Sequence, residues 1–211
     1  MNSILVNLSS QKGVTLLELM IATAILAIVI TVAVPSFSDA GDSQRLIGAA
    51  EQVYNHIQQA RSESVSGNSV AYVNFNAPVS PTAASATWQY GVSTGNSLCA
   101  LTATTPTAAN ACVIVVSDGD ANLDPGDGSV DTDDLVLMRY TDADWAGVSM
   151  QINSFSSGNT QIVFNPVRGT STDGEINLVS GLGKLLRIEL SLLGRPTICS
   201  PDGSIPNYKV C

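Results

Sequence analysis

The feature that most constrains this chain is an uninterrupted apolar run near its N-terminus, residues 14–34. The run is VTLLELMIATAILAIVITVAV and contains no lysine or arginine. A helix of about 20 apolar residues spans the roughly 30 Å hydrocarbon core of a bilayer. A secretory signal peptide has a shorter apolar core of about 7–15 residues, and its small-residue cleavage site follows that core. The run therefore predicts a membrane-spanning helix.

Glu18 is the one charged residue in this run. A carboxylate at the centre of a membrane helix costs about 2.5–3.5 kcal/mol on insertion scales, so an acid inside such a helix usually has a function. Cleavage between Gly13 and Val14 would create an α-amine four residues before Glu18. The two charges could then pair within one chain or between neighbouring chains. The alternative is a plain N-terminal anchor in which Gly13 has no special role.

The stretch KGVTLLELM, residues 12–20, resembles the class III signal of type IV pilins and type II secretion pseudopilins. The resemblance implies that a prepilin peptidase cuts after Gly13 and methylates the new amine of Val14. It also implies that Glu18 engages the N-terminal amine of an adjacent subunit during assembly. Val14 stands where phenylalanine is more usual. Pro35 fits the pilin pattern in which a proline ends or kinks the membrane helix, so a kink or local melting is expected there.

Beyond the membrane run, the helix is expected to continue and to end within residues 64–68. Apolar residues recur there at spacings of three and four: Leu46, Ala50, Val53, Tyr54, Ile57 and Ala60. This stripe should pack on a globular head. His56, the only histidine, lies at the border of the stripe. We expect His56 to pack rather than to act chemically, because no acid and nucleophile accompany it.

After residue 68 the sequence changes to short runs of β-type character, separated by Pro, Gly, Ser and Asn. Nine strands are expected: 70–75, 87–92, 112–116, 134–140, 148–152, 161–164, 175–179, 184–192 and 195–199. The predicted fold class is α+β, with a long N-terminal α-helix packed on an antiparallel β-sheet head of two small sheets, the pilin fold. The predicted parts are the leader peptide 1–13, the transmembrane and assembly helix 14–35, the amphipathic half of the helix 36–68 and the β-rich head 69–211.

The order of later motifs resembles the GspH/FimT group of minor pilins and pseudopilins. ARSESV at 60–65, WQYGV at 88–92, VFNP at 163–166 and Gly194-Arg195 follow in that group's order. The resemblance implies a structural protein and not an enzyme. Its implied partners are other major and minor pilins, the prepilin peptidase and the inner-membrane assembly platform. The implied location is the inner membrane, crossed once with the head in the periplasm, and then a pilus or pseudopilus near its tip.

The four cysteines fit a head outside the cytoplasm, where disulfides persist. Lys12 before the apolar run predicts that orientation. Four cysteines allow three connectivities. We favour Cys99–Cys112 and Cys199–Cys211, because each closes a loop of about a dozen residues, and the other two connectivities stay open. A zinc site is not expected, since the sequence has no CxxC pair and no histidine near these cysteines.

Half of the acidic residues lie within residues 118–144. Part of this region, DGDANLDPGDGSVD, offers oxygen ligands at alternating positions: Asp118, Asp120, Asn122 and Asp124. Calcium prefers such ligands. The EF-hand spacing fails, however, because Leu123 or Pro125 takes the place of the turn glycine. A solvated loop is favoured over a calcium site, and no other cofactor is expected.

A net charge of −9 argues against a general nucleic-acid coat, because binding to the phosphate backbone needs a basic surface. Some FimT-like pilins carry a Gly-Arg-x-Arg motif tied to DNA binding in natural transformation. Here the stretch GRPT at 194–197 lacks the second arginine. The candidate DNA contacts are Arg187, Arg195 and Lys209, with Lys184 nearby in sequence. We favour a hairpin corner over a DNA site at this position.

Taken with the resemblance, these features predict a minor type IV pilin that assembles into or primes a pilus through its N-terminal helix. Two alternatives remain: a FimT-like DNA-binding pilin for natural transformation and a GspH-like pseudopilin of type II protein secretion.

Overall fold

The computed structural model describes residues 13–77, 87–115, 134–153, 155 and 160–211. By its internal contacts the chain divides into two compact units, Met1–Ala40 and Gly41–Cys211. We call the second unit the head. One helix, α1 (Leu16–Ser66), contributes to both units.

Helix α1 is continuous through Pro35, so the local melting expected there is wrong. A proline inside a helix removes one backbone hydrogen bond, and helical turns on both sides of Pro35 continue the helix. Two polar side chains of the apolar half bond to their own helix. The Thr23 hydroxyl donates to the Met20 carbonyl (3.0 Å) and the Thr31 hydroxyl to the Ile28 carbonyl (2.7 Å). Such internal pairing is what a helix needs in lipid, where no water satisfies polar groups.

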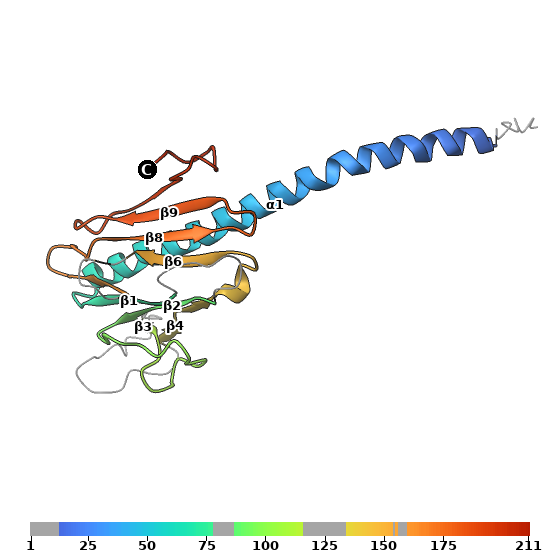
Figure 1. The fold of residues 1–211 in the computed structure, drawn as a ribbon. Helices are drawn as coiled ribbons and strands as arrows, with labels where there is room; N and C mark the ends of the chain where they lie inside the picture. The colour runs from blue at the N-terminus through green and yellow to red at the C-terminus, as the bar shows by residue number, and fades with distance from the viewer. Residues whose placement is uncertain (1–12, 78–86, 116–133, 154, 156–159) are drawn as a thin grey trace, which may run out of the picture. The chain divides into compact units, whose positions relative to one another are not determined.

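The described part of the head contains ten strands in three antiparallel sheets (Figure 1). The first sheet has the order β5-β2-β1-β7: Arg139–Thr141, Gln89–Thr94, Ala71–Asn76 and Gln161–Phe164. The second has the order β10-β9-β8-β6: Pro196–Cys199, Leu185–Leu190, Gly174–Val179 and Ser149–Asn153. The third pairs β3 (Val113–Val115) with β4 (Leu135–Leu137), and a 3-10 helix, η1 (Asp142–Asp144), follows β5. The predicted α+β architecture is confirmed, with one more small sheet than expected.

The segment expected as one strand, 134–140, is two strands in two different sheets. The division falls at Met138, whose amide donates to the Cys112 carbonyl (2.7 Å) and whose carbonyl accepts from the Val92 amide (2.9 Å). Met138 thus carries the chain from the small sheet to the first four-stranded sheet while its side chain stays buried. Sequence alternation predicts an extended chain but not which neighbour each half pairs with, so the sequence could not show this change of sheet.

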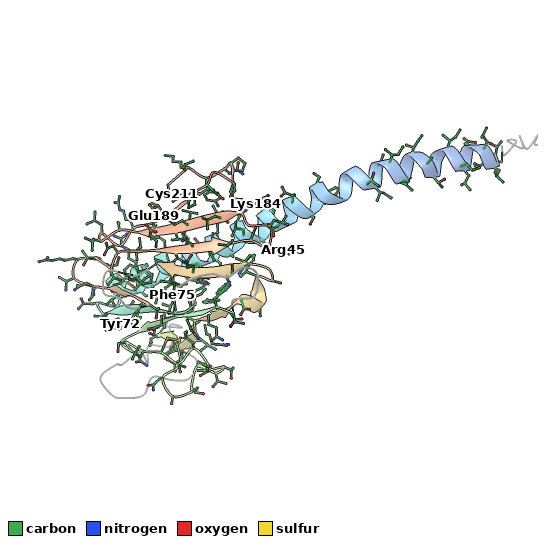
Figure 2. All side chains as sticks on the ribbon, viewed as in Figure 1. Arg45, Tyr72, Phe75, Lys184, Glu189 and Cys211 are labelled. Atoms are coloured by element: carbon green, nitrogen blue, oxygen red, sulfur yellow. A yellow bond between two sulfur atoms is a disulfide. The ribbon has the colours of Figure 1, made fainter. Side chains whose placement is uncertain are left out.

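The predicted stripe of α1 forms one side of the hydrophobic core. Its members Leu46, Ala50, Val53, Ile57 and Ala60 are fully buried, and Tyr54 is partly buried. They belong to one cluster with side chains of both four-stranded sheets, among them Phe75, Tyr90 and Ile188. Figure 2 shows Phe75 in the interior of the head. The head therefore holds this half of α1 through apolar burial.

Both disulfides favoured from the sequence are formed, Cys99–Cys112 and Cys199–Cys211. The second closes the C-terminal loop, in which Ile205 is buried and the Tyr208 hydroxyl donates to a Glu51 carboxylate oxygen on α1 (3.0 Å). Burial, together with the contact to Glu51, raises the pKa of Tyr208 to about 12. The C-terminus is thus held to α1 by packing, a hydrogen bond and a crosslink.

Candidate processing and assembly site

The candidate cleavage site lies immediately before α1. Gly13, Val14 and Thr15 are outside the helix, and the Val14 side chain is 73% exposed. Thr15 caps the helix, since its Oγ1 accepts a hydrogen bond from the Glu18 amide (3.2 Å). Thr-x-x-Glu is the spacing of a capping box. The helix therefore starts at Leu16 and leaves the Gly13–Val14 bond in non-helical chain. The role of Thr15 as a cap was not predicted from the sequence, although the capping-box spacing indicates it.

Glu18 lies in the first turn of α1 and is exposed. The helix dipole favours an acid at this end. Around it the large apolar side chains are exposed as well: Val14, Leu16, Leu17, Leu19, Met20, Ile21, Ile25, Leu26, Ile28, Val29 and Ile30. By length and composition α1 could cross a membrane. Pro35 lies within α1, and its side chain is outside the described part of the structure.

His56 forms part of a polar and aromatic cluster on the other half of α1. Its Nδ1 lies 2.7 Å from the Tyr90 hydroxyl, and its ring stacks on Tyr140 with centroids 3.9 Å apart. Burial lowers the pKa of His56. Burial also raises the pKa of Tyr90, with smaller contributions from Tyr140 and Asp144. These contacts place His56 in a packing position between α1 and the first sheet.

The candidate DNA-contacting cations do not gather at one place. Arg187, in the middle of β9, forms ion pairs with Glu175 (3.3 Å) and Glu189 (3.8 Å) and donates to the Asn177 side chain (2.9 Å). The two other cations near β9 lie at opposite ends of the strand. Lys184 precedes β9 and donates to the Ser43 hydroxyl (2.6 Å), whereas Arg195 follows its far end and is exposed. Lys209 is exposed in the C-terminal loop.

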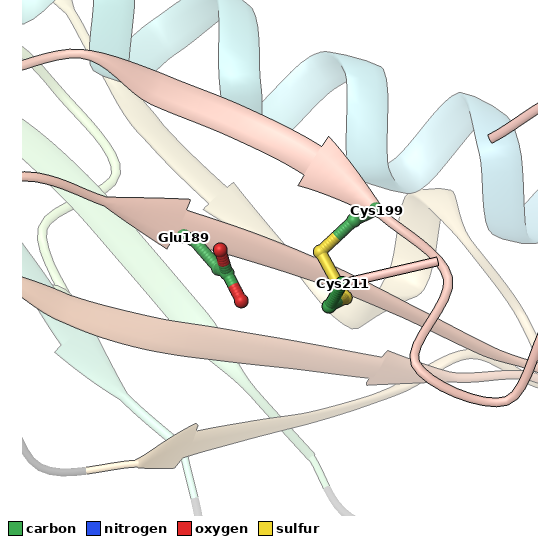
Figure 3. A group of neighbouring side chains, drawn as sticks. All are labelled: Glu189, Cys199 and Cys211. Carbon is green, nitrogen blue, oxygen red and sulfur yellow. A yellow bond between two sulfur atoms is a disulfide. The ribbon is translucent and has the colours of Figure 1, made fainter. Parts of the chain in front are cut away.

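One group of potential metal ligands lies within the described residues, Glu189 with Cys199 and Cys211 (Figure 3). Both sulfur atoms are committed to the disulfide. A disulfide sulfur is not the thiolate that binds metals, so the group does not fit a metal ion. The calcium candidates Asp118, Asp120, Asn122 and Asp124 lie outside the described residues.

Two protein-family models match the chain. The model of the prokaryotic N-terminal methylation motif matches residues 8–34. The model described as type II transport protein GspH matches residues 49–194, more than half of the chain. The chain belongs to the GspH family. No curated protein and no solved structure matches it significantly.

The two matches fall on the two parts of the molecule described above. The methylation motif covers Gly13, Glu18 and the apolar half of α1, and the GspH match covers most of the packed half of α1 and the strands β1 to β9. The resemblance to the GspH/FimT group is therefore confirmed. The two matches identify a pilin-like or pseudopilin-like protein, and the motif with the long apolar helix fits an anchor in the inner membrane.

Proposed function

We propose that this GspH-family protein is a minor type IV pilin with a structural, non-enzymatic role. The observation that carries the proposal is the arrangement at the start of α1. The Gly13–Val14 bond is non-helical, and the first turn of α1 directly after it exposes Glu18. An exposed apolar surface then continues along the helix. The GspH head then follows on the same helix.

In the proposed mechanism, prepilin peptidase cuts after Gly13 and methylates the amine of Val14. The helix then moves from lipid into a bundle of like helices, where its apolar side chains pack against neighbours. In that dry environment an unpaired carboxylate is costly. Pairing Glu18 with the amine of a neighbouring Val14 removes this cost and fixes the axial position of one helix against the next.

The proposed location of the head is the periplasm and then the filament, near its tip. Two disulfides support an oxidising compartment. The proposed partners are major and minor pilins, the peptidase and the inner-membrane assembly platform.

A second candidate function is a pseudopilin of type II secretion. The family description, type II transport protein, favours it. Sheared surface filaments and a secretion assay separate the two: a minor pilin is found in the filaments, and its deletion leaves secreted enzymes unchanged. DNA binding is less favoured, because Arg187 is already paired with two carboxylates.

The processing step is tested by Gly13→Leu in the full precursor. A bulky residue at the cleavage site should abolish the shift to mature size on a gel. The matched control is Gly41→Leu in the same helix, where an added Cβ would meet no atom within 4 Å. Normal maturation of Gly13→Leu would contradict the assigned cleavage site.

The assembly step is tested by Glu18→Leu. The variant should insert into the membrane and be cleaved, because the apolar run becomes more apolar, yet should fall at least about tenfold in sheared filaments. Glu51→Gln is the control for losing a carboxylate, because it removes the charge of an exposed acid on the packed half of α1 and keeps an oxygen that can accept from the Tyr208 hydroxyl. Wild-type amounts of Glu18→Leu in filaments would rule out the proposed pairing.

A further inference from the structure

The end of the head where α1 stops is built from three chain segments that approach closely. They are the last turns of α1, the β7–β8 turn (165–170) and the β9–β10 turn (191–195), which lie on one side of the head in Figure 1. The Ser171 amide donates to the Leu192 carbonyl (3.1 Å). A Cβ on Gly194, which has φ +70°, would lie 2.5 Å from the Gly169 carbonyl oxygen and 3.2 Å from Arg61 Nε. Glycine at 194 therefore allows the two turns and Arg61 to meet.

These segments expose large apolar side chains together with arginines. We call the set the α1-end patch: Val65, Val167, Leu192, Leu193, Arg61, Arg168 and Arg195. Val167 is 82% exposed and Leu193 66%. The turn conformation requires Gly194 but not the two leucines before it, since turns are ordinarily made by Gly, Pro, Asn, Asp and Ser. Exposed apolar side chains that gather on one surface, in contrast to ones scattered singly, are typical of an interaction site.

The arginines of this patch differ from Arg187 in their pairing. Among the described residues, none of Arg61, Arg168 and Arg195 forms an ion pair, whereas Arg187 forms two. One acid on the same end of α1, Glu63, offsets a single positive charge. The exposed acid of η1, Asp144, is far from the patch. The ring of the next residue, Trp145, lies against Gly48 of α1. Gly48 and Arg61 are about 20 Å apart along α1 at 1.5 Å per residue. The patch is thus locally basic on an acidic chain.

The composition of the patch fits a protein partner better than a nucleic acid. Arginine is enriched and lysine depleted at protein–protein interfaces. Exposed aliphatic side chains gain from burial against another apolar surface, which a phosphate backbone does not offer. Single-stranded nucleic acid is held by cations with aromatic side chains on which bases stack, and the patch has no aromatic residue. We infer that the α1-end patch docks another pilin-type subunit, through a surface that presents carboxylates around aliphatic side chains. This inference rests on the proposed function and names the partner class of the head.

The test is site-specific photo-crosslinking in cells that make the full set of pilus subunits. A photoreactive amino acid replaces Leu193 in the full-length chain. The matched control replaces Leu182, because Leu182-Gly183-Lys184 repeats the local pattern of Leu193-Gly194-Arg195 at the opposite end of β9, with an exposed leucine and a glycine at positive φ. Mass spectrometry identifies the crosslinked protein and peptide.

The expected result is one crosslinked species at Leu193 and none at Leu182. Its partner should carry a class III signal and an acidic contact peptide. Arg168→Glu with Arg195→Glu should lower its yield at least about fivefold, with unchanged amounts of mature chain, since both arginines are exposed. A crosslink to a second copy of the chain, to DNA or to nothing at Leu193 would overturn the inference, as would equal yields at both positions. If the wild-type chain is absent from sheared filaments, the proposed function fails instead.

Discussion

Between residues 16 and 30 the large apolar side chains of α1 are exposed, whereas between Leu46 and Ala60 a single apolar stripe is buried and exposed polar residues such as Glu51 and Asn55 lie outside it. Secondary structure is the same in both halves, but the distribution of apolar residues around the helix differs. A helix that is apolar all round requires an apolar environment on every side, whereas an amphipathic helix requires one partner surface. The second half has found its partner in the sheets, and the first half needs lipid or other helices.

The largest expected effect is on the stability of the head, and it comes from truncating one isoleucine in each half of α1. Ile57→Ala should lower the free energy of unfolding of the head by about 2–5 kcal/mol, because Ile57 is fully buried and the change leaves a cavity. Ile25→Ala should leave it unchanged, because the Ile25 side chain is 58% exposed and contributes nothing to the head core. Thermal unfolding of the full chain in detergent micelles, followed by near-UV circular dichroism, measures both. Equal effects of the two substitutions would contradict the conclusion that only the second half of α1 packs in the head core.

Replacing either of two glycines of α1 by alanine should change the stability by a smaller amount, with opposite signs at the two positions. A Cβ on Gly48 would lie 2.5 Å from the Trp145 ring, which also donates a hydrogen bond to Gln52. Gly48→Ala should therefore destabilise the head by about 1–3 kcal/mol, the usual cost of overpacking. Gly41→Ala meets no atom within 4 Å and should stabilise α1 by up to about 1 kcal/mol through helix propensity. Urea titrations of both variants test the signs. A stable Gly48→Ala head would show that Trp145 moves freely.

The spacing of apolar residues in the sequence predicted which face of α1 packs on the sheets. Local sequence pattern also predicted most of the strands. The stripe at Leu46, Val53 and Ile57 has the 3-and-4 spacing of a helix face, and residues 161–164 form a strand with the bounds expected. These features depend on local pattern, which the sequence displays directly. The class III signal was equally readable, because it places Gly13 and Glu18 at fixed spacing in a run without lysine or arginine.

Features that depend on pairing between distant segments were not predicted. Met138 divides an expected strand because its amide and carbonyl bond to two different neighbours, Cys112 and Val92. The α1-end patch needs the end of α1 to meet two turns that come about a hundred or more residues later in the chain, around Arg61. Arg187 was a candidate for DNA contact, but its charge is taken up by Glu175 on the neighbouring strand β8 and by Glu189 two residues along β9. Such relations follow from topology and register, and neither can be read from a single segment.

The smallest expected effect concerns His56, the histidine on the packed half of α1. Burial lowers the pKa of His56 below its ordinary value of 6.5, so the unfolded chain binds the proton more tightly than the folded chain. Stability from this group is therefore complete above about pH 6.5 and is lost as the pH falls from there through the lower folded pKa. The facing groups, Tyr90 and Tyr140, stay neutral in this range because burial raises the pKa of each. Asp144, which acts on Tyr90, is the nearby charge.

Unfolding temperatures of the full chain at pH 7.5, 6.5 and 5.5 should therefore fall toward the acidic side, by less than either substitution above produces. His56→Gln provides the matched control, because glutamine keeps a polar group within reach of the Tyr90 hydroxyl and does not titrate. Its unfolding temperature should change less over the same interval. If wild type and His56→Gln lose the same stability on acidification, other groups carry the pH dependence and His56 is protonated as readily in the folded head as in the unfolded chain. A difference between them would show that packing of this half of α1 on the sheets makes protonation of His56 less favourable in the folded head than in the unfolded chain.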